Sequence, residues 1–160
     1  MVAERFGDFG GIMKRFVVAA LAASLMLPAG GAGAADGCYT ASALEAEQGM
    51  RFLIDLMVAS TACRDQTYGL FQQRNKETVL AYQRTLITHF HGNAAYDRWD
   101  TALANDAAMR DAGKTAPQAC QESADVLKRA AAMNDAAFRA YAASLATTAE
   151  ASGRYKKCGR

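Results

Sequence analysis

Apolar residues recur at helical spacing from Ser42 almost to the C-terminus, and this pattern constrains the fold more than any other feature of the sequence. Within this stretch Pro117 is the one proline, and glycines are few. No segment shows the apolar–polar alternation of a half-buried β-strand. The chain is therefore predicted to be all-α.

Two helical segments are expected in the first half of this stretch. One spans about 43–64, opened by a capping box of Ser42 and Glu45. Its apolar face is predicted to hold Met50, Leu53, Ile54, Met57 and Val58. The next spans about 66–90, where Asn75 is an N-cap residue type that could divide the segment in two.

Two further helices are expected after Gly92. One covers about 94–112 and the other about 117–149, the latter opened by Thr115, Pro117 and Gln118. Apolar positions from Cys120 to Leu145 alternate spacings of four and three residues, which is the coiled-coil period and favours one continuous helix. In the alternative, the helix breaks at Met133-Asn134 and Asn134 becomes an N-cap.

Four antiparallel helices with short loops pack most simply as an up-down four-helix bundle. Such a bundle brings Cys63 close to Cys120 at one end, and Cys38 close to Cys158 at the other. Sequence alone allows three pairings of four cysteines. The topology favours Cys63–Cys120 and Cys38–Cys158, although a break at Asn134 would weaken this choice.

The first 35 residues have the organisation of a secretory signal peptide. Basic Lys14 and Arg15 precede an apolar stretch over 16–27, and small residues before Asp36 supply a cleavage site. Twelve apolar residues span about 18 Å, too short for a membrane anchor across roughly 30 Å of hydrocarbon. Because acidic residues among the first twelve suit a leader poorly, translation could begin at Met13. We therefore expect a single domain over 36–160 without a stable membrane anchor, located in the periplasm or secreted.

The composition of this domain limits its partners. Removing residues 1–35 from a chain of 160 leaves 125, and it lowers the net charge from +2 to about +1. Nucleic acid is therefore not an expected partner, since phosphate binding needs a concentrated basic surface. The basic tail over 150–160 is expected to be a frayed terminus. All four cysteines lie in the exported part, where an oxidising compartment favours disulfides.

Motifs for catalysis or cofactor binding are lacking, so no cofactor is expected. His89 and His91 are the only histidines, and their spacing of two points the rings apart on a helix, which makes them weak metal candidates. The segment Tyr96-Asp97-Arg98-Trp99-Asp100 is the densest polar and aromatic cluster. Asp97 or Asp100 with His91 would be an acid/base pair in one interpretation; in the other, Tyr96 and Trp99 are core residues and the carboxylates favour the helix dipole.

Several short motifs resemble those of a group of small exported proteobacterial proteins without a known activity. They are Cys38-Tyr39, Leu56-Met57-Val58-Ala59, Cys63-Arg64, the stretch 68–75, Ala95-Tyr96-Asp97-Arg98, Leu103-Ala104-Asn105 and Cys120. The resemblance covers about 38–120 and implies export and a helical fold with disulfides. An S-adenosylhomocysteine hydrolase activity, a label that such proteins sometimes carry, does not fit a chain without the dinucleotide fingerprint.

The sequence thus favours a periplasmic helical protein that is not an enzyme and acts through contacts with a protein partner in the cell envelope. Tyr96, Asp97, Arg98 and Asp100 are its candidate interaction residues. The alternative is a small-ligand or metal-binding protein that uses the region 89–100, which requires its polar side chains to converge on one pocket.

Overall fold

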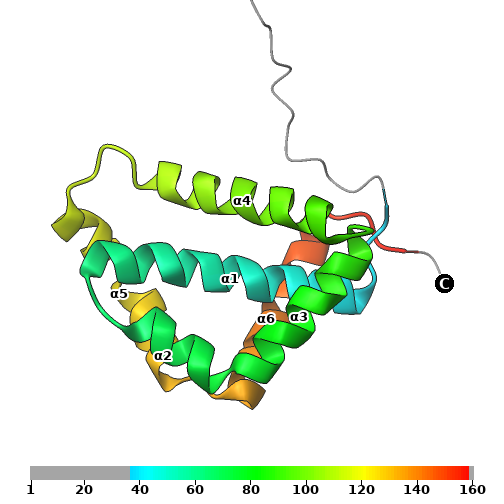
Figure 1. Ribbon diagram of the computed structural model, residues 1–160, viewed down its shortest axis with the longest axis horizontal. Helices are drawn as coiled ribbons and strands as arrows, with labels where there is room; N and C mark the ends of the chain where they lie inside the picture. Colours follow the sequence, from blue (N-terminus) through cyan, green and yellow to red (C-terminus); the bar gives the residue numbers. More distant parts are fainter. Residues whose placement is uncertain (1–36, 159–160) are drawn as a thin grey trace, which may run out of the picture.

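The computed structural model describes residues 37–158, and these form six helices (Figure 1). The helices are α1 (Ala41–Cys63), α2 (Thr67–Arg74), α3 (Lys76–His89), α4 (Asn93–Arg110), α5 (Ala116–Ala132) and α6 (Asp135–Ala151). Over the described residues the only β-type pairing is a single bridge between Tyr39 and Lys157. The all-α class is therefore confirmed, whereas the expected leader and the start at Met13 lie outside the described residues.

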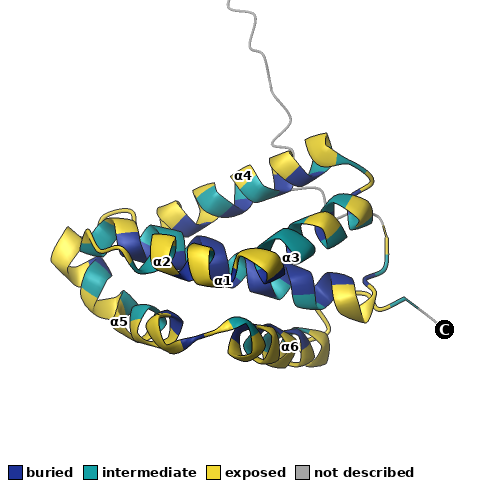
Figure 2. Cartoon of the chain, turned by 60° about the horizontal axis from the view of Figure 1, so that its bottom comes forward, coloured by how far each residue is buried: buried dark blue, intermediate teal, exposed yellow. Residues whose placement is uncertain are grey.

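Helix α1 occupies the centre of the molecule. It packs against each of the other five helices, and in Figure 1 it lies between α4 on one side and α5–α6 on the other. Its buried residues consequently occur around most of its circumference (Figure 2). Of the predicted apolar face, Met50, Leu53 and Ile54 are buried, but Met57 and Val58 are only half-buried. The expectation of one buried face was too narrow because α1 has neighbours on several sides.

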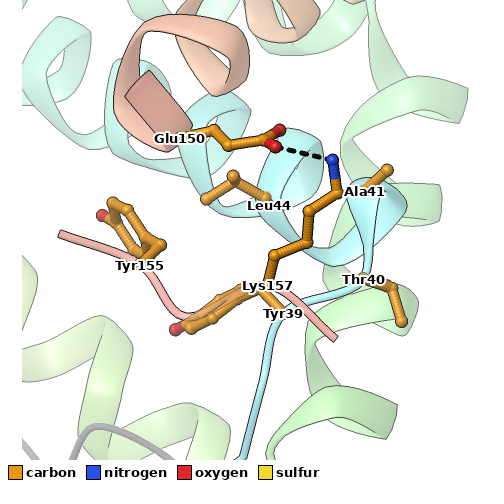
Figure 3. A pocket seen from close by; sticks show the side chains of 7 residues that line it. All are labelled: Tyr39, Thr40, Ala41, Leu44, Glu150, Tyr155 and Lys157. Atoms are coloured by element: carbon orange, nitrogen blue, oxygen red, sulfur yellow. Dashed lines mark hydrogen bonds and ion pairs between the residues drawn. The ribbon is translucent and has the colours of Figure 1, made fainter. Parts of the chain in front are cut away.

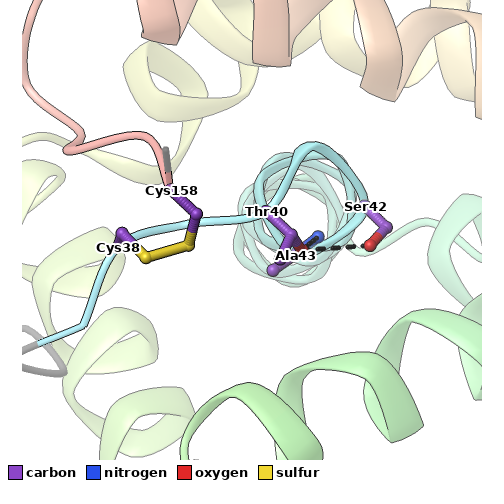
Figure 4. Close-up of a disulfide and its surroundings, with 5 residues drawn as sticks. All are labelled: Cys38, Thr40, Ser42, Ala43 and Cys158. Carbon is purple, nitrogen blue, oxygen red and sulfur yellow. Dashed lines mark hydrogen bonds between the residues drawn. A yellow bond between two sulfur atoms is a disulfide. The ribbon is translucent and has the colours of Figure 1, made fainter. Parts of the chain in front are cut away.

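The first helix begins earlier than the sequence suggests. Thr40 is its N-cap, and its side-chain oxygen accepts a hydrogen bond of 3.1 Å from the amide of Ala43 (Figure 4). The predicted capping box of Ser42 and Glu45 is therefore wrong. Glu45 instead accepts a 2.7 Å hydrogen bond from the hydroxyl of Tyr82. Its side chain therefore takes part in a tertiary contact and does not cap the helix.

Both possible breaks in the longer segments are present. Asn75 separates α2 from α3, is fully buried, and donates from its side-chain nitrogen to the carbonyl of Phe71 at 2.9 Å. The preferred continuous helix over 117–149 is wrong. Met133 adopts an extended conformation and is buried, and Asn134 caps α6 by accepting from the amide of Ala137 at 3.0 Å. A cap and a buried side chain together offset the backbone hydrogen bonds lost at the break.

The predicted capping box at the start of α5 is confirmed, with Gln118 accepting from the Thr115 amide at 2.9 Å. The simple up-down four-helix bundle, in contrast, is not confirmed, because the described chain forms six helices, five of which pack around α1. Among residues 37–158, no helix is both long and apolar enough to cross a bilayer.

Two disulfides join the pairs that the sequence favoured, Cys38–Cys158 and Cys63–Cys120. The pairing holds although the last helix is broken, because α5 and α6 both pack along α1 and the chain does not reverse between them. The C-terminal tail, which was expected to be frayed, is paired with the N-terminal segment as far as Cys158. The amide of Tyr39 donates to the carbonyl of Lys156 at 2.7 Å, and the amide of Cys158 donates back to Tyr39 at 3.0 Å.

Aromatic rings close one side of α1. Phe138 of α6 is fully buried, with its ring centroid 4.9 Å from that of Phe71 and 5.6 Å from that of Tyr82. Gly49 lets α3 approach closely, since a β-carbon there would lie 2.5 Å from the Tyr82 ring. The close approach and the edge-to-face ring contacts make this a tightly packed part of the core.

Candidate functional site

The two histidines lie in different environments. The His89 ring is half-buried with its centroid 4.2 Å from that of Tyr39, and its buried Nε2 has no hydrogen-bond partner within the described chain. Burial lowers the pKa of His89, and His91 adds to this effect while Glu47 opposes it. His91 is exposed and has a positive φ of 61° in the turn before α4. Across residues 37–158, no three His, Cys, Asp or Glu side chains cluster in a way that could hold a metal ion.

The predicted interaction residues of α4 point in several directions. Tyr96 and Trp99 are buried in the core, whereas Asp97 and Arg98 are exposed. Asp100 is half-buried, and burial, assisted by Asp97, raises the pKa of its carboxyl. None of the hollows described below is lined by these side chains or by the two histidines.

A hollow between α4 and α5–α6, with α1 as its floor, is the larger of two that share lining residues. It has a volume of about 290 Å³ and is lined by Gln48, Arg51, Phe52, Asp55, Leu103, Arg110, Val126, Tyr141 and Leu145. A second hollow of about 190 Å³ shares Asp55, Arg110 and Val126 with the first and is lined by Val58, Ala59, Ala107, Asp111, Glu122 and Ser123 as well. These two adjoining hollows are together called the groove below.

The groove is long and amphipathic. Its floor runs along α1 from Gln48 to Ala59, which is about 16 Å at the helical rise per residue. Apolar side chains line the larger hollow next to charged ones. Phe52 and Leu103 are buried, whereas Tyr141 and Leu145 are half-buried and keep part of their surface open. A surface of this kind can accept a polypeptide segment with apolar side chains on one side.

Arg51 lies at one end of the groove and forms an ion pair with Glu47, which is buried behind it. Its Nε and Nη2 both donate to Oε1 of Glu47, at 2.8 and 2.6 Å. Its guanidinium carbon lies 5.9 Å from the centroid of the Trp99 ring, within the range of a cation–π contact. Burial opposes the charged form, but the nearby Glu47 carboxylate raises the pKa of Arg51, which therefore stays protonated.

Glu47 itself is almost completely buried, with 1% of its surface exposed. Its Oε1 also accepts a 3.0 Å hydrogen bond from the hydroxyl of Tyr155, which reaches it from the C-terminal tail. Its Oε2 is buried without a hydrogen-bond partner in the described chain. Burial raises the pKa of Tyr155, and Glu47 raises it further, so this hydroxyl remains a donor. A buried carboxylate is costly unless it is paired, and the partner that compensates for it here is Arg51.

The other end of the groove carries charges that pair with one another. Arg110 of α4 forms an ion pair with Asp55 of α1. Lys114 bridges Asp111 at 2.9 Å and Glu122 at 2.6 Å, and so links the end of α4 to α5. Burial raises the pKa of Asp55 more than Arg110 lowers it.

A small pocket near the N-terminus of α1 is not a comparable site. It lies between Tyr39, Leu44 and Tyr155 beneath the 2.6 Å ion pair of Lys157 with Glu150 (Figure 3). Its volume is about 10 Å³, which is room for about one water molecule.

Arg51 and Asp55 on the groove floor, and Glu47 behind it, were not predicted as site residues from the sequence. Glu47, Arg51 and Asp55 follow one another at spacings of four, which places them on one face of α1. That spacing was the available signal, but it is also typical of a solvated helix face. A comparison of the chain with protein-family models, curated proteins and solved structures finds no match.

Proposed function

We propose that this protein binds a polypeptide partner in the groove between α4 and α5–α6, and that it acts by this contact and not by catalysis. The proposal rests on the groove along α1, in which half-buried apolar side chains lie beside charged side chains that form ion pairs. Helix-in-groove recognition uses surfaces of this composition.

The pairing of the groove charges supports binding over catalysis. Arg51 is held by Glu47, Asp55 by Arg110, and Lys114 by Asp111 and Glu122. A general acid or base must be free to exchange a proton with a substrate. Charged groups that are already engaged in ion pairs are better suited to positioning a partner.

An exported location is part of the same proposal. Two disulfides suit an oxidising compartment, and residues 1–35 read as a cleavable leader. The resemblance to small exported proteobacterial proteins leads us to propose the periplasm and a role as an accessory or assembly factor of the cell envelope. We further propose an up-down order of four segments, α1, α2–α3, α4 and α5–α6, two of which are broken helices.

The test is site-specific photocrosslinking in cells that export the protein. A benzophenone amino acid replaces Leu145, which lines the groove, and in a matched variant it replaces Leu70, which is 55% exposed on α2 outside the groove. We expect a discrete crosslinked polypeptide from position 145 and not from position 70. Equal products from both positions, or only the uncrosslinked protein from position 145, would contradict the proposal.

A further inference from the structure

We propose that Arg51 receives a carboxylate from the bound segment, so that the partner presents an acidic side chain next to apolar residues that fill the larger hollow. This inference rests on the proposed function and specifies the chemistry of the partner. It follows from three features: how Arg51 is held, which of its donors remain free, and which charges line the hollow around it.

The first feature is the fixed position of the guanidinium group. Glu47 accepts from both Nε and Nη2 through a single oxygen, while the ring of Trp99 lies 5.9 Å away. Because Glu47 is 1% exposed, its carboxylate is anchored in the core and cannot follow Arg51 into solvent. Arg51 is therefore oriented before a partner arrives, which reduces the entropy lost on binding.

The second feature is the number of donors that remain. A guanidinium group carries five N–H groups, and the described structure engages two of them. The side chain is 38% exposed and lines the larger hollow. Three N–H groups are thus available at the edge of an apolar surface, where a hydrogen bond to a carboxylate is stronger than it is in open water.

The third feature is the balance of charge in the larger hollow. Arg51 and Arg110 line it, but Asp55 is the one carboxylate among its lining residues, and Asp55 pairs with Arg110. Glu47, the partner of Arg51, is not among those residues because it lies behind the floor. Within the lining of this hollow, no unpaired carboxylate therefore faces the remaining N–H groups of Arg51, and an acidic group on the partner would complement them.

The apolar lining specifies the rest of the segment. Phe52, Leu103, Tyr141 and Leu145 flank Arg51 in the same hollow. The groove floor of about 16 Å corresponds to about three helical turns. The structure therefore favours an amphipathic helical segment with apolar residues at i, i+3, i+4 and i+7 and a glutamate or aspartate at the edge of that stripe.

Two designed peptides test this chemistry on the mature protein. Both are amphipathic helices of about 14 residues with leucine at those four positions, and they differ only by Glu or Gln at the edge. Trp99 is the single tryptophan of the chain and lies against Arg51, so its fluorescence reports binding. We expect the Glu peptide to bind about tenfold more tightly than the Gln peptide.

The matched variant is the double substitution Glu47→Gln with Arg51→Gln, which removes both charges together. The single change Arg51→Gln would leave an unpaired buried carboxylate and could unfold the protein. Arg98→Gln is the control, because Arg98 is exposed on α4 and does not line the groove. Circular dichroism checks that all proteins are folded. We expect the preference for Glu to fall below about twofold in the double variant and to persist in the control.

Equal affinity for the two peptides, no binding of either, or a preference that survives the double substitution would overturn the inference. Tighter binding of dodecanoate than of the Glu peptide would overturn it as well, in favour of a small amphipathic carboxylate. The crosslinking experiment separates this failure from that of the proposed function. If the double variant captures the same partner from position 145 as the unaltered protein, Arg51 is not the anchor, but the groove still binds a polypeptide.

Discussion

The two sides of α1 show how one helix can support both stability and an open surface. On one side Gly49 and edge-to-face aromatic contacts bring α3 and α6 close to α1. On the other side Arg51 and Asp55 line a groove that separates α4 from α5–α6. Small and aromatic residues allow close packing, whereas charged side chains must keep contact with water or a partner. The difference indicates that the aromatic side supports the fold, whereas the charged side leaves an open surface.

The largest expected effect comes from removing a ring on the closed side. Phe138→Ala should lower the free energy of unfolding by about 4–5 kcal/mol, because the fully buried ring packs against three other aromatic residues. Leu145→Ala on the groove side should cost only about 1 kcal/mol, since that side chain is half-buried. Urea titration measures both values. A similar loss of unfolding free energy in the two variants would mean that residues on the groove side contribute to the core as much as those on the aromatic side.

The next effect concerns the disulfide that joins the end of α1 to the start of α5. The double substitution Cys63→Ser with Cys120→Ser should lower stability by about 4 kcal/mol, because the bridge closes a loop across a separation of 57 residues. Thermal unfolding under non-reducing conditions tests this value. The pair Cys38 and Cys158, separated by 120 residues, provides the comparison and should have a similar effect. If neither double variant differs from the unaltered protein, the bridges do not hold the helices together.

A smaller effect tests the close approach of α3. Gly49→Ala should destabilise the protein by about 2 kcal/mol, because the added methyl group would lie 2.5 Å from Cε2 of Tyr82. Gly69→Ala is a matched control in α2, where an added β-carbon meets nothing within 4 Å. That control should be neutral or stabilising by up to about 1 kcal/mol. Equal effects of the two changes on the urea midpoint would show that α1 and α3 are not closely packed.

The smallest effect is a pH dependence due to His89. Burial lowers its pKa below the ordinary value of 6.5, so just below pH 6.5 the unfolded chain takes up a proton that the folded protein does not. The free energy of unfolding should therefore fall as the pH drops from 7 towards 6. Asp55 and Asp100, whose carboxyl pKa values are raised by burial, act in the opposite direction but at lower pH.

The substitution His89→Gln should remove this slope, whereas His91→Gln should retain most of it, because burial is the largest cause of the lowered pKa of His89 and His91 is only a minor one. The measurement is a series of urea titrations between pH 7 and pH 6. An unchanged slope in the His89 variant would assign the pH dependence to another group.

The candidate site could be predicted much less well than the fold. The segment Tyr96 to Asp100 was predicted to hold interaction residues because polar and aromatic residues are dense there. In the structure, however, Tyr96 and Trp99 belong to the core and Asp97 faces solvent. The groove residues come from four helices that are distant in sequence, so no local motif marks them. Trp99 contributes to the site only indirectly, through its contact with Arg51.

The sequence by itself determined the helical class and the capping box at Thr115, and it favoured the two cysteine pairs that the structure contains. These features depend on periodicity, on neighbouring residues and on the order of helices along the chain. Only the tertiary structure decided that α1 is surrounded, that the helix breaks at Met133 with Asn134 as the N-cap of α6, and that Glu47 is buried behind Arg51. The environment of a side chain depends on which distant helices pack around it, and a residue pattern within one helix does not contain that information.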